Sequence, residues 1–209
     1  MVLTTAGEHR KAETMTDTQA TTRDQSSSPA NEVPAVDAPA VTGERAEWLE
    51  ALAKHRHFLR FTTRDLTDEQ AGRRTTAGEL CLGGLIKHVS AVEEGWVNFI
   101  LHGTSAMPDF TAMTEDDLAR RADQFRMLPG ETLAGVLADY EEAARRTDEV
   151  VAALPDLDRA WPLPKAPWFE PGTQWSARRV LMHIVAETAQ HAGHADIIRE
   201  CLDGAKSMG

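Results

Sequence analysis

The sequence predicts an all-α protein built as a four-helix bundle, with a long aromatic and proline-rich loop before the last helix. Apolar residues recur every three or four positions along four long segments, which is the period of one helix face. Capping residues or helix breakers bound these segments. No stretch shows a convincing run of alternating β-branched residues, the pattern of a strand. Four long helices joined by connections of unequal length favour a bundle.

The first 43 residues differ in composition from the rest of the chain. They contain no phenylalanine, tryptophan, tyrosine or isoleucine and are crowded with threonine, serine, alanine and proline. Such a segment cannot bury enough apolar surface to offset the entropy lost on ordering. We therefore expect a disordered leader over residues 1–43 and one helical domain over residues 44–209.

The first long helix is predicted to begin at Glu44. Its apolar stripe recurs at spacings of four and three and includes a histidine; it consists of Trp48, Leu52, His55, Leu59, Thr62 and Leu66. Thr67 then caps a short helical turn. The second long helix is predicted within residues 79–103, where Gly83 and Gly84 are small enough to allow close packing against a neighbour.

The second half of the chain continues the pattern. Thr114, followed three residues later by Asp117, predicts a capping box and a short acidic helix. A third long helix is expected within residues 131–154. Residues 159–175 hold four prolines and three tryptophans, so we expect them to fold over one end of the bundle. Ser176 caps the last helix, which Gly204 ends.

Ionisable residues fall on the buried faces of two predicted helices. With about 100° of rotation per residue, Glu187 and His191 lie in the middle of the apolar face of the last helix, and His183 and His194 at its edge. On the second helix, His88 belongs to the apolar face. Burying a carboxylate without a partner costs several kcal/mol, so the chain must compensate for this arrangement.

A divalent metal ion would compensate, since imidazole nitrogen and carboxylate oxygen are ordinary ligands of zinc, iron and nickel. Glu187 and His191 stand one helical turn apart and can chelate one ion, and His88 can complete the set from a facing helix. Three protein ligands leave a coordination position open, as in catalytic sites. The competing interpretation is structural: a histidine on an apolar face is usually a core residue, and Glu187 could pair with Arg178, Arg199 or His191.

Five further residues are candidates for lining a substrate pocket beside these ligands. Their side chains are imidazoles or indoles near the same faces, or belong to the aromatic loop; they are His194, His55, Trp96, Trp175 and His183. We expect His194 to contact a ligand or the substrate rather than to act as a fourth ligand. His55 is the weakest candidate, because it lies near the end of its stripe.

The two helices that carry the histidines resemble a known family. ELCLGGLIKHVSAVEEGWV and, about a hundred residues later, RRVLMHIVAETAQHAGHADIIRECLDG are similar to the DinB/YfiT-like superfamily, above all to its actinobacterial subfamily of unknown function. The resemblance covers residues 44–204. It implies a four-helix bundle that binds one divalent metal, zinc before nickel or iron, through His88, Glu187 and His191. Most members have three histidines; the two-histidine, one-glutamate set here resembles mycothiol-dependent maleylpyruvate isomerase.

The resemblance also implies a reaction class. Several members are metal-dependent transferases or isomerases that use a low-molecular-weight thiol such as mycothiol, so a thiol co-substrate and a small electrophile are the expected partners. A metal would lower the pKa of the bound thiol and hold a nucleophilic thiolate. Two alternatives stay open: a non-catalytic metal-binding or stress-response module that forms a homodimer through its last helix, and a 2-His-1-carboxylate iron oxygenase.

Composition excludes other partners. The formal net charge of -11 and pI of about 5.2 argue against binding nucleic acid or an anionic membrane, both of which need a basic surface. No segment has 18 or more apolar residues in a row, so none is expected to span a membrane. The two cysteines, Cys81 and Cys201, form no CxxC pair, which is typical of a protein of the reducing cytoplasm.

Overall fold

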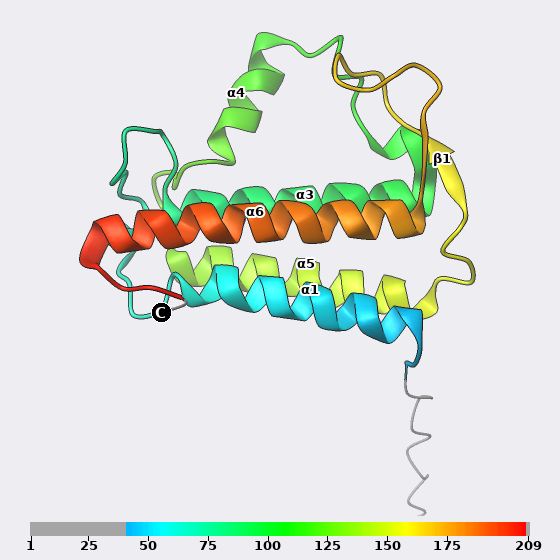
Figure 1. The fold of residues 1–209 in the computed structure, drawn as a ribbon. Helices are drawn as coiled ribbons and strands as arrows, with labels where there is room; N and C mark the ends of the chain where they lie inside the picture. Colours follow the sequence, from blue (N-terminus) through cyan, green and yellow to red (C-terminus); the bar gives the residue numbers. More distant parts are fainter. Residues whose placement is uncertain (1–40, 208–209) are drawn as a thin grey trace, which may run out of the picture. The chain divides into compact units, whose positions relative to one another are not determined.

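The fold of residues 41–207 is described from a computed structural model. Four long helices form a bundle: α1 (Glu44–Phe61), α3 (Leu82–His102), α5 (Leu133–Ala153) and α6 (Ala177–Asp203). Helix α1 packs against α6 and α5, and α3 packs against the same two helices, so α1 lies diagonally opposite α3. Figure 1 shows α3 and α6 side by side, with α4 (Glu115–Asp123) and two long connections on their outer side. The predicted all-α bundle is confirmed.

Shorter elements complete this part of the chain. Helix α2 spans Asp68–Ala71, and the 3-10 turn η1 spans Gly103–Ala106. The predicted capping boxes are present: the Thr67 hydroxyl accepts from the Gln70 amide, and the Thr114 hydroxyl accepts from the Asp117 amide. Ser176 accepts from Arg179 at the start of α6, and Gly204 ends that helix with a φ of 80°. These local rules of helix ends therefore operate as the sequence predicts.

The apolar faces of the four long helices meet in a core with two clusters. Leu52, Phe99 and Ile184 lie in the cluster nearer the aromatic loop, and Leu85 and Tyr140 in the other; all five are fully buried. Within residues 41–207, no helix is both long and apolar enough to span a membrane. The leader predicted over residues 1–43 lies almost wholly outside the described residues, and α1 begins at Glu44.

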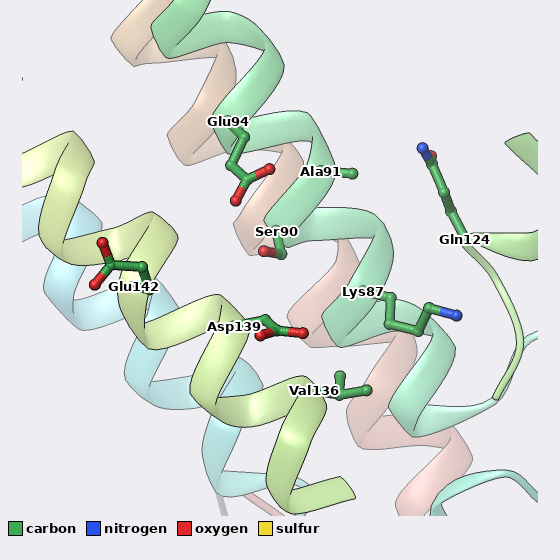
Figure 2. A pocket seen from close by; sticks show the side chains of 8 residues that line it. All are labelled: Lys87, Ser90, Ala91, Glu94, Gln124, Val136, Asp139 and Glu142. Carbon is green, nitrogen blue, oxygen red and sulfur yellow. The ribbon is translucent and has the colours of Figure 1, made fainter. Parts of the chain in front are cut away.

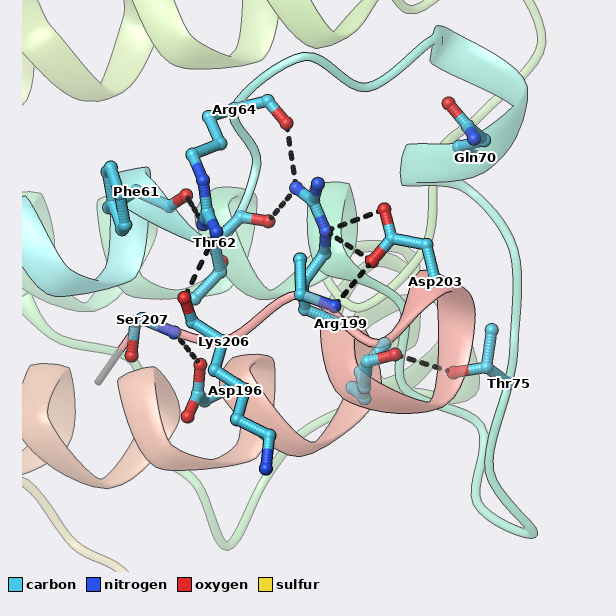
Figure 3. A network of polar contacts seen from close by, with 12 residues as sticks. Phe61, Thr62, Arg64, Gln70, Thr75, Asp196, Arg199, Asp203, Lys206 and Ser207 are labelled. Carbon is cyan, nitrogen blue, oxygen red and sulfur yellow. Dashed lines mark hydrogen bonds and ion pairs between the residues drawn. The ribbon is translucent and has the colours of Figure 1, made fainter. Parts of the chain in front are cut away.

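One boundary differs from the prediction. Helix α1 ends at Phe61, not near Leu66, and the chain then passes through turns in which Asp65 has a φ of 58°. Figure 3 shows how the end is stabilised: the Arg199 guanidinium of α6 donates to the carbonyl oxygens of Thr62 at 2.8 Å and Arg64 at 2.7 Å. These bonds pair carbonyl groups at and just after the helix end, where no further turn of helix is available to pair them. Helix α1 therefore ends at a contact with α6, although its apolar stripe continues to Leu66.

The aromatic connection contains a small sheet that the sequence did not reveal. Strands β1 (Ala160–Pro162) and β2 (Gln174–Ser176) pair antiparallel, with Trp161 opposite Trp175. Three residues are too few for an alternating pattern to be recognised. The Trp161 indole donates to the Ile100 carbonyl at 3.1 Å and packs on Gly103, whose φ of 71° and missing Cβ both suit glycine. The connection is thereby anchored to the end of α3.

Two glycines near the start of α3 allow the segment after α4 to approach closely. A Cβ on Gly84 would lie 2.0 Å from the Phe125 carbonyl oxygen, and a Cβ on Gly83 would lie 2.4 Å from the Met127 sulfur. Lys87 holds the same segment through its ammonium group, which donates to the carbonyls of Asp123 and Arg126. The result is that the segment after α4 passes directly over α3 beside His88.

The core also contains a buried ion pair. Glu93 of α3 is fully buried and accepts hydrogen bonds from the Arg56 guanidinium of α1, one of them at 3.2 Å. The same guanidinium donates to Asp148 of α5 at 2.8 Å. Arg56 therefore joins three of the four long helices by paired charges.

Candidate metal centre

The structure brings together His88, Glu187 and His191. One potential ligand atom from each side chain lies within 4.8 Å of those of the other two. His191 Nε2 lies 3.6 Å from Glu187 Oε2, and the rings of His88 and His191 meet edge to face with centroids 4.8 Å apart. Among residues 41–207 no other group of histidine, cysteine or carboxylate side chains has this geometry. The three residues selected by helical spacing thus converge on one point between α3 and α6.

His88 has the environment of a neutral histidine with a free lone pair. Its ring is buried and stacks on Phe125 with centroids 4.0 Å apart, and Nδ1 has no hydrogen-bond partner in the described part of the chain. Burial, followed by the charge of nearby His191, lowers the pKa of His88 to about 4. A buried ring nitrogen without a partner is unusual, and a metal ion is a group that would satisfy such a nitrogen.

Glu187 is ionised and faces a cavity rather than the closed core. The His191 hydrogen bond lowers the pKa of the Glu187 carboxyl against an opposing effect of burial, and the charges of the nearby histidines lower it further. The Glu187 side chain is 28% exposed. The sequence placed it in the middle of the buried helix face, so the prediction of its burial was wrong. Neither proposed arginine partner contacts it, because Arg178 pairs with Glu44 and Asp158, while Arg199 pairs with Asp203.

The candidate pocket residues separate into two groups. His183 lies beside the triad, with Nε2 at 3.8 Å from Glu187 Oε1, and its ring meets Trp96 and Trp175 edge to face. Those two indoles stack at 4.9 Å. Burial lowers the pKa of His183. His183 and Trp96 line the cavity, whereas Trp175 does not line it but contacts both of their rings.

The other two histidines do not line the cavity. His194 Nδ1 lies 3.4 Å from His191 Nδ1, so one ring can donate to the other and fix its tautomer. His194 therefore contacts His191, which is a candidate metal ligand, and is not itself a member of the triad. His55 is half-buried on α1, the helix diagonally opposite α3, and does not belong to the cavity wall.

The cavity beside the triad has a volume of about 610 Å³. His88 and Glu187 lie in its wall, and aromatic side chains from three separate segments surround them: Trp96, Phe110, Phe125, Trp168 and Phe169. The Phe110 amide donates a hydrogen bond to the Lys165 carbonyl at 2.9 Å, which joins the two connections that carry this wall. The aromatic loop therefore lies at the site, as its composition predicted.

Sequence reasoning missed the contribution of α4 and the segments that flank it. Phe110, Arg121, Gln124 and Phe125 all line the cavity. The sequence offered one signal for these residues, which is that Phe110 and Phe125 flank a short acidic helix. No spacing rule relates them to His88. Their position depends on the glycines of α3.

A second hollow, between α3 and α5, is shown in Figure 2 and has a volume of about 340 Å³. Its wall carries Lys87, Glu94, Asp139 and Glu142 and no histidine. Lys87 is paired with Glu131 at 2.7 Å. Within residues 41–207, the one group with the geometry of metal ligands lies at the triad and not in this hollow.

Comparison with known proteins agrees with the fold and identifies the family. The crystal structure of a conserved protein from Enterococcus faecalis superposes with a TM-score of 0.59 over 79% of this chain and 100% of that chain, at 13% sequence identity, which is a likeness of fold. No curated protein matches the sequence. The family model described as mycothiol-S-transferase matches residues 47–204, a span that contains most of α1, the triad and the whole cavity wall. The chain belongs to this mycothiol-S-transferase family, which is DinB/YfiT-like.

Proposed function

We propose that this protein is a metal-dependent S-transferase that joins a small thiol of the mycothiol type to a small electrophile. The observation that carries the proposal is the triad itself: three potential ligand atoms within 4.8 Å, opening onto an aromatic cavity. The family supports the thiol as co-substrate. An open cavity favours catalysis over a purely structural metal, since structural sites are closed by four protein ligands.

Two residues of the triad, His88 and Glu187, have protonation states suited to holding a cation. His88 is neutral at pH 7 because its pKa lies near 4, and Glu187 supplies one negative charge. His194 orients the His191 ring through the contact between their Nδ1 atoms. A divalent ion bound here would lower the pKa of a thiol and stabilise its thiolate. Zinc suits two imidazoles and one carboxylate best among ions without redox chemistry.

The reaction balances without a further reactant. The thiol loses its S–H proton to solvent, a sulfur–carbon bond forms to the electrophile, and the bond from that carbon to its leaving group breaks. Aromatic side chains line the cavity where the sulfur would lie, and His183 Nε2 lies 3.8 Å from Glu187 Oε1.

The same ligand set also fits iron(II), which keeps the oxygenase as a second candidate. Elemental analysis of protein purified from its native host decides between them: zinc supports the transferase, and stoichiometric iron supports the oxygenase.

The transferase is tested with zinc-loaded full-length protein, mycothiol and monochlorobimane. We expect conjugation to be at least about a hundredfold faster than with Glu187→Ala, since removing the charge removes the bound ion. Glu200→Ala is the matched control, because this exposed glutamate of α6 pairs only with Lys206. Equal rates for wild type and Glu187→Ala would refute the proposal for this substrate.

A further inference from the structure

One arginine of the cavity wall has no carboxylate partner. Arg121, near the end of α4, lines the cavity, whereas its neighbour Arg120 pairs with Asp117 and Arg126 pairs with Asp123. Among residues 41–207, no carboxylate lies within ion-pair distance of Arg121. Its guanidinium instead packs over the Phe110 ring, 5.3 Å from the centroid. Arg121 is exposed, as Arg120 and Arg126 are, but unlike those two it lines the cavity and packs on an aromatic ring of its wall.

The rest of the wall leaves this charge uncompensated. Among the described residues that line the cavity, Glu187 is the only carboxylate, and it already contacts His183 and His191. The same part of the chain contributes no lysine and no other arginine to this wall. Arg121 nevertheless acts on the triad at a distance, because its charge is among the causes that lower the pKa of His88. An exposed guanidinium that lines an aromatic hollow and has no ion pair can attract an anion to that hollow.

We infer that the electrophile accepted by this site carries a carboxylate, and that Arg121 binds it and so determines specificity. This inference rests on the proposed S-transfer function. The nucleophilic sulfur would lie at the triad, so the electrophile must approach from the part of the cavity bounded by Phe110, Trp168 and Arg121. A guanidinium binds a carboxylate through two parallel hydrogen bonds, and the aromatic rings would hold a flat or unsaturated body beside it.

The experiment compares two electrophiles that differ in charge: 4-chloro-3-nitrobenzoate and 4-chloro-3-nitrobenzamide. In both, the thiolate forms a sulfur–carbon bond, chloride leaves, and the thiol proton passes to buffer. The value of kcat/KM is divided by the uncatalysed rate for each compound, with zinc-loaded full-length protein and mycothiol. The variants are Arg121→Gln, Arg121→Lys and, as the matched control from the same helix, Arg120→Gln.

We expect Arg121→Gln to lower kcat/KM for the acid by about tenfold or more, and to leave the amide and the KM for mycothiol within about twofold. Arg121→Lys should retain part of the preference, and Arg120→Gln all of it. An equal loss for acid and amide, or no loss for either, would overturn the inference. A raised KM for mycothiol with an unchanged preference would assign Arg121 to the thiol and also overturn it.

A binding measurement separates this inference from the proposed function. Quenching of tryptophan fluorescence by 3-nitrobenzoate and by 3-nitrobenzamide reports occupancy of the indole-lined cavity without turnover. We expect wild type to bind the acid at least about tenfold more tightly than the amide. Arg121→Gln, at the same zinc content, should bind the acid and the amide with equal affinity. If no protein turns over any electrophile, the transferase proposal fails while this preference still supports Arg121. If wild type binds acid and amide equally, the Arg121 inference fails whatever the turnover.

Discussion

At the scale of single residues, the charge of Glu187 is the feature that a metal ion most requires. Glu187→Gln keeps the size of the side chain and removes the negative charge beside His191 and His183. We expect the zinc content to fall well below that of wild type and added zinc no longer to raise Tm, because an ion stabilises only the state that binds it. Elemental analysis and melting curves with and without zinc measure this, with Glu200→Gln as control. Equal zinc stoichiometry in both proteins would contradict the proposed site.

His88 gives a pH dependence of stability whose sign follows from its environment. Its pKa falls from 6.5 to about 4 on folding, so between these values the unfolded chain binds a proton that the folded chain does not. The contribution is therefore fully present above pH 6.5 and is lost as the pH falls towards 4. We expect the free energy of unfolding of metal-free protein to drop over this window by on the order of 2 to 3 kcal/mol more than that of His88→Asn.

Urea denaturation of chelator-treated protein at several pH values tests this difference. The pKa values of Glu187 and His183 are also lowered, and both residues are present in His88→Asn. The difference in stability between the two proteins therefore reports the contribution of His88. Parallel stability curves for the two proteins between pH 4 and 6.5 would show that His88 is not the residue that titrates.

At the scale of elements, the contact between α3 and the segment after α4 holds the site in shape. A Cβ on Gly84 would meet the Phe125 carbonyl carbon at 2.2 Å and its oxygen at 2.0 Å, and this backbone cannot move as a flexible side chain would. We expect Gly84→Ala to lower the free energy of unfolding by about 1 to 3 kcal/mol. It should also weaken zinc binding, because Phe125 stacks on His88.

Gly95→Ala is the control for this change. Gly95 lies in the same helix, and nothing lies within 4 Å of a Cβ placed there. Alanine should stabilise the helix by up to about 1 kcal/mol through its higher helix propensity. Thermal melts and zinc titrations of both variants measure the contrast; if Gly84→Ala behaved like Gly95→Ala, the close approach would have no energetic consequence.

Elements are also where the sequence was most informative. The caps at Thr67, Thr114 and Ser176 depend on residues three positions apart, so local rules were sufficient to predict them. The convergence of His88 with Glu187 needed only helical spacing and the assumption that apolar faces meet. The end of α1 was mispredicted because Arg199, distant in sequence, donates to carbonyls there. Phe110 could not be placed, since connections between helices carry no periodicity, and Arg121 could not, since no spacing rule relates its short helix to α3.

At the scale of the whole described domain, the Arg56–Glu93 pair links α1 to α3 and, through Asp148, to α5. This pair could not be predicted from the sequence, because charged residues beside an apolar stripe are normally solvated. Glu93 is fully buried, so Glu93→Gln leaves the Arg56 charge incompletely compensated. We expect a loss of about 3 to 5 kcal/mol in the free energy of unfolding, with zinc stoichiometry unchanged in the folded protein.

The neighbouring Glu94 provides the matched control. It is exposed, so Glu94→Gln should change stability by no more than about 0.5 kcal/mol. Urea denaturation of the two variants compares one charge in the core with one on the surface of the same helix. A similar small effect for both would mean that the buried pair contributes no net stability.

The last prediction concerns residues 1–40, whose composition lacks the aromatic anchors and apolar stripe of the rest of the chain. We expect a variant that begins at Val41 to keep the Tm and zinc content of the full chain. A variant that begins at Glu44 should be slightly less stable, because it loses the Gly43 carbonyl that accepts from the amides of Ala46 and Glu47 at the start of α1. Melting curves of the three proteins distinguish these effects. A fall of more than a few degrees on removing residues 1–40 alone would show that the leader contributes to the stability of the bundle.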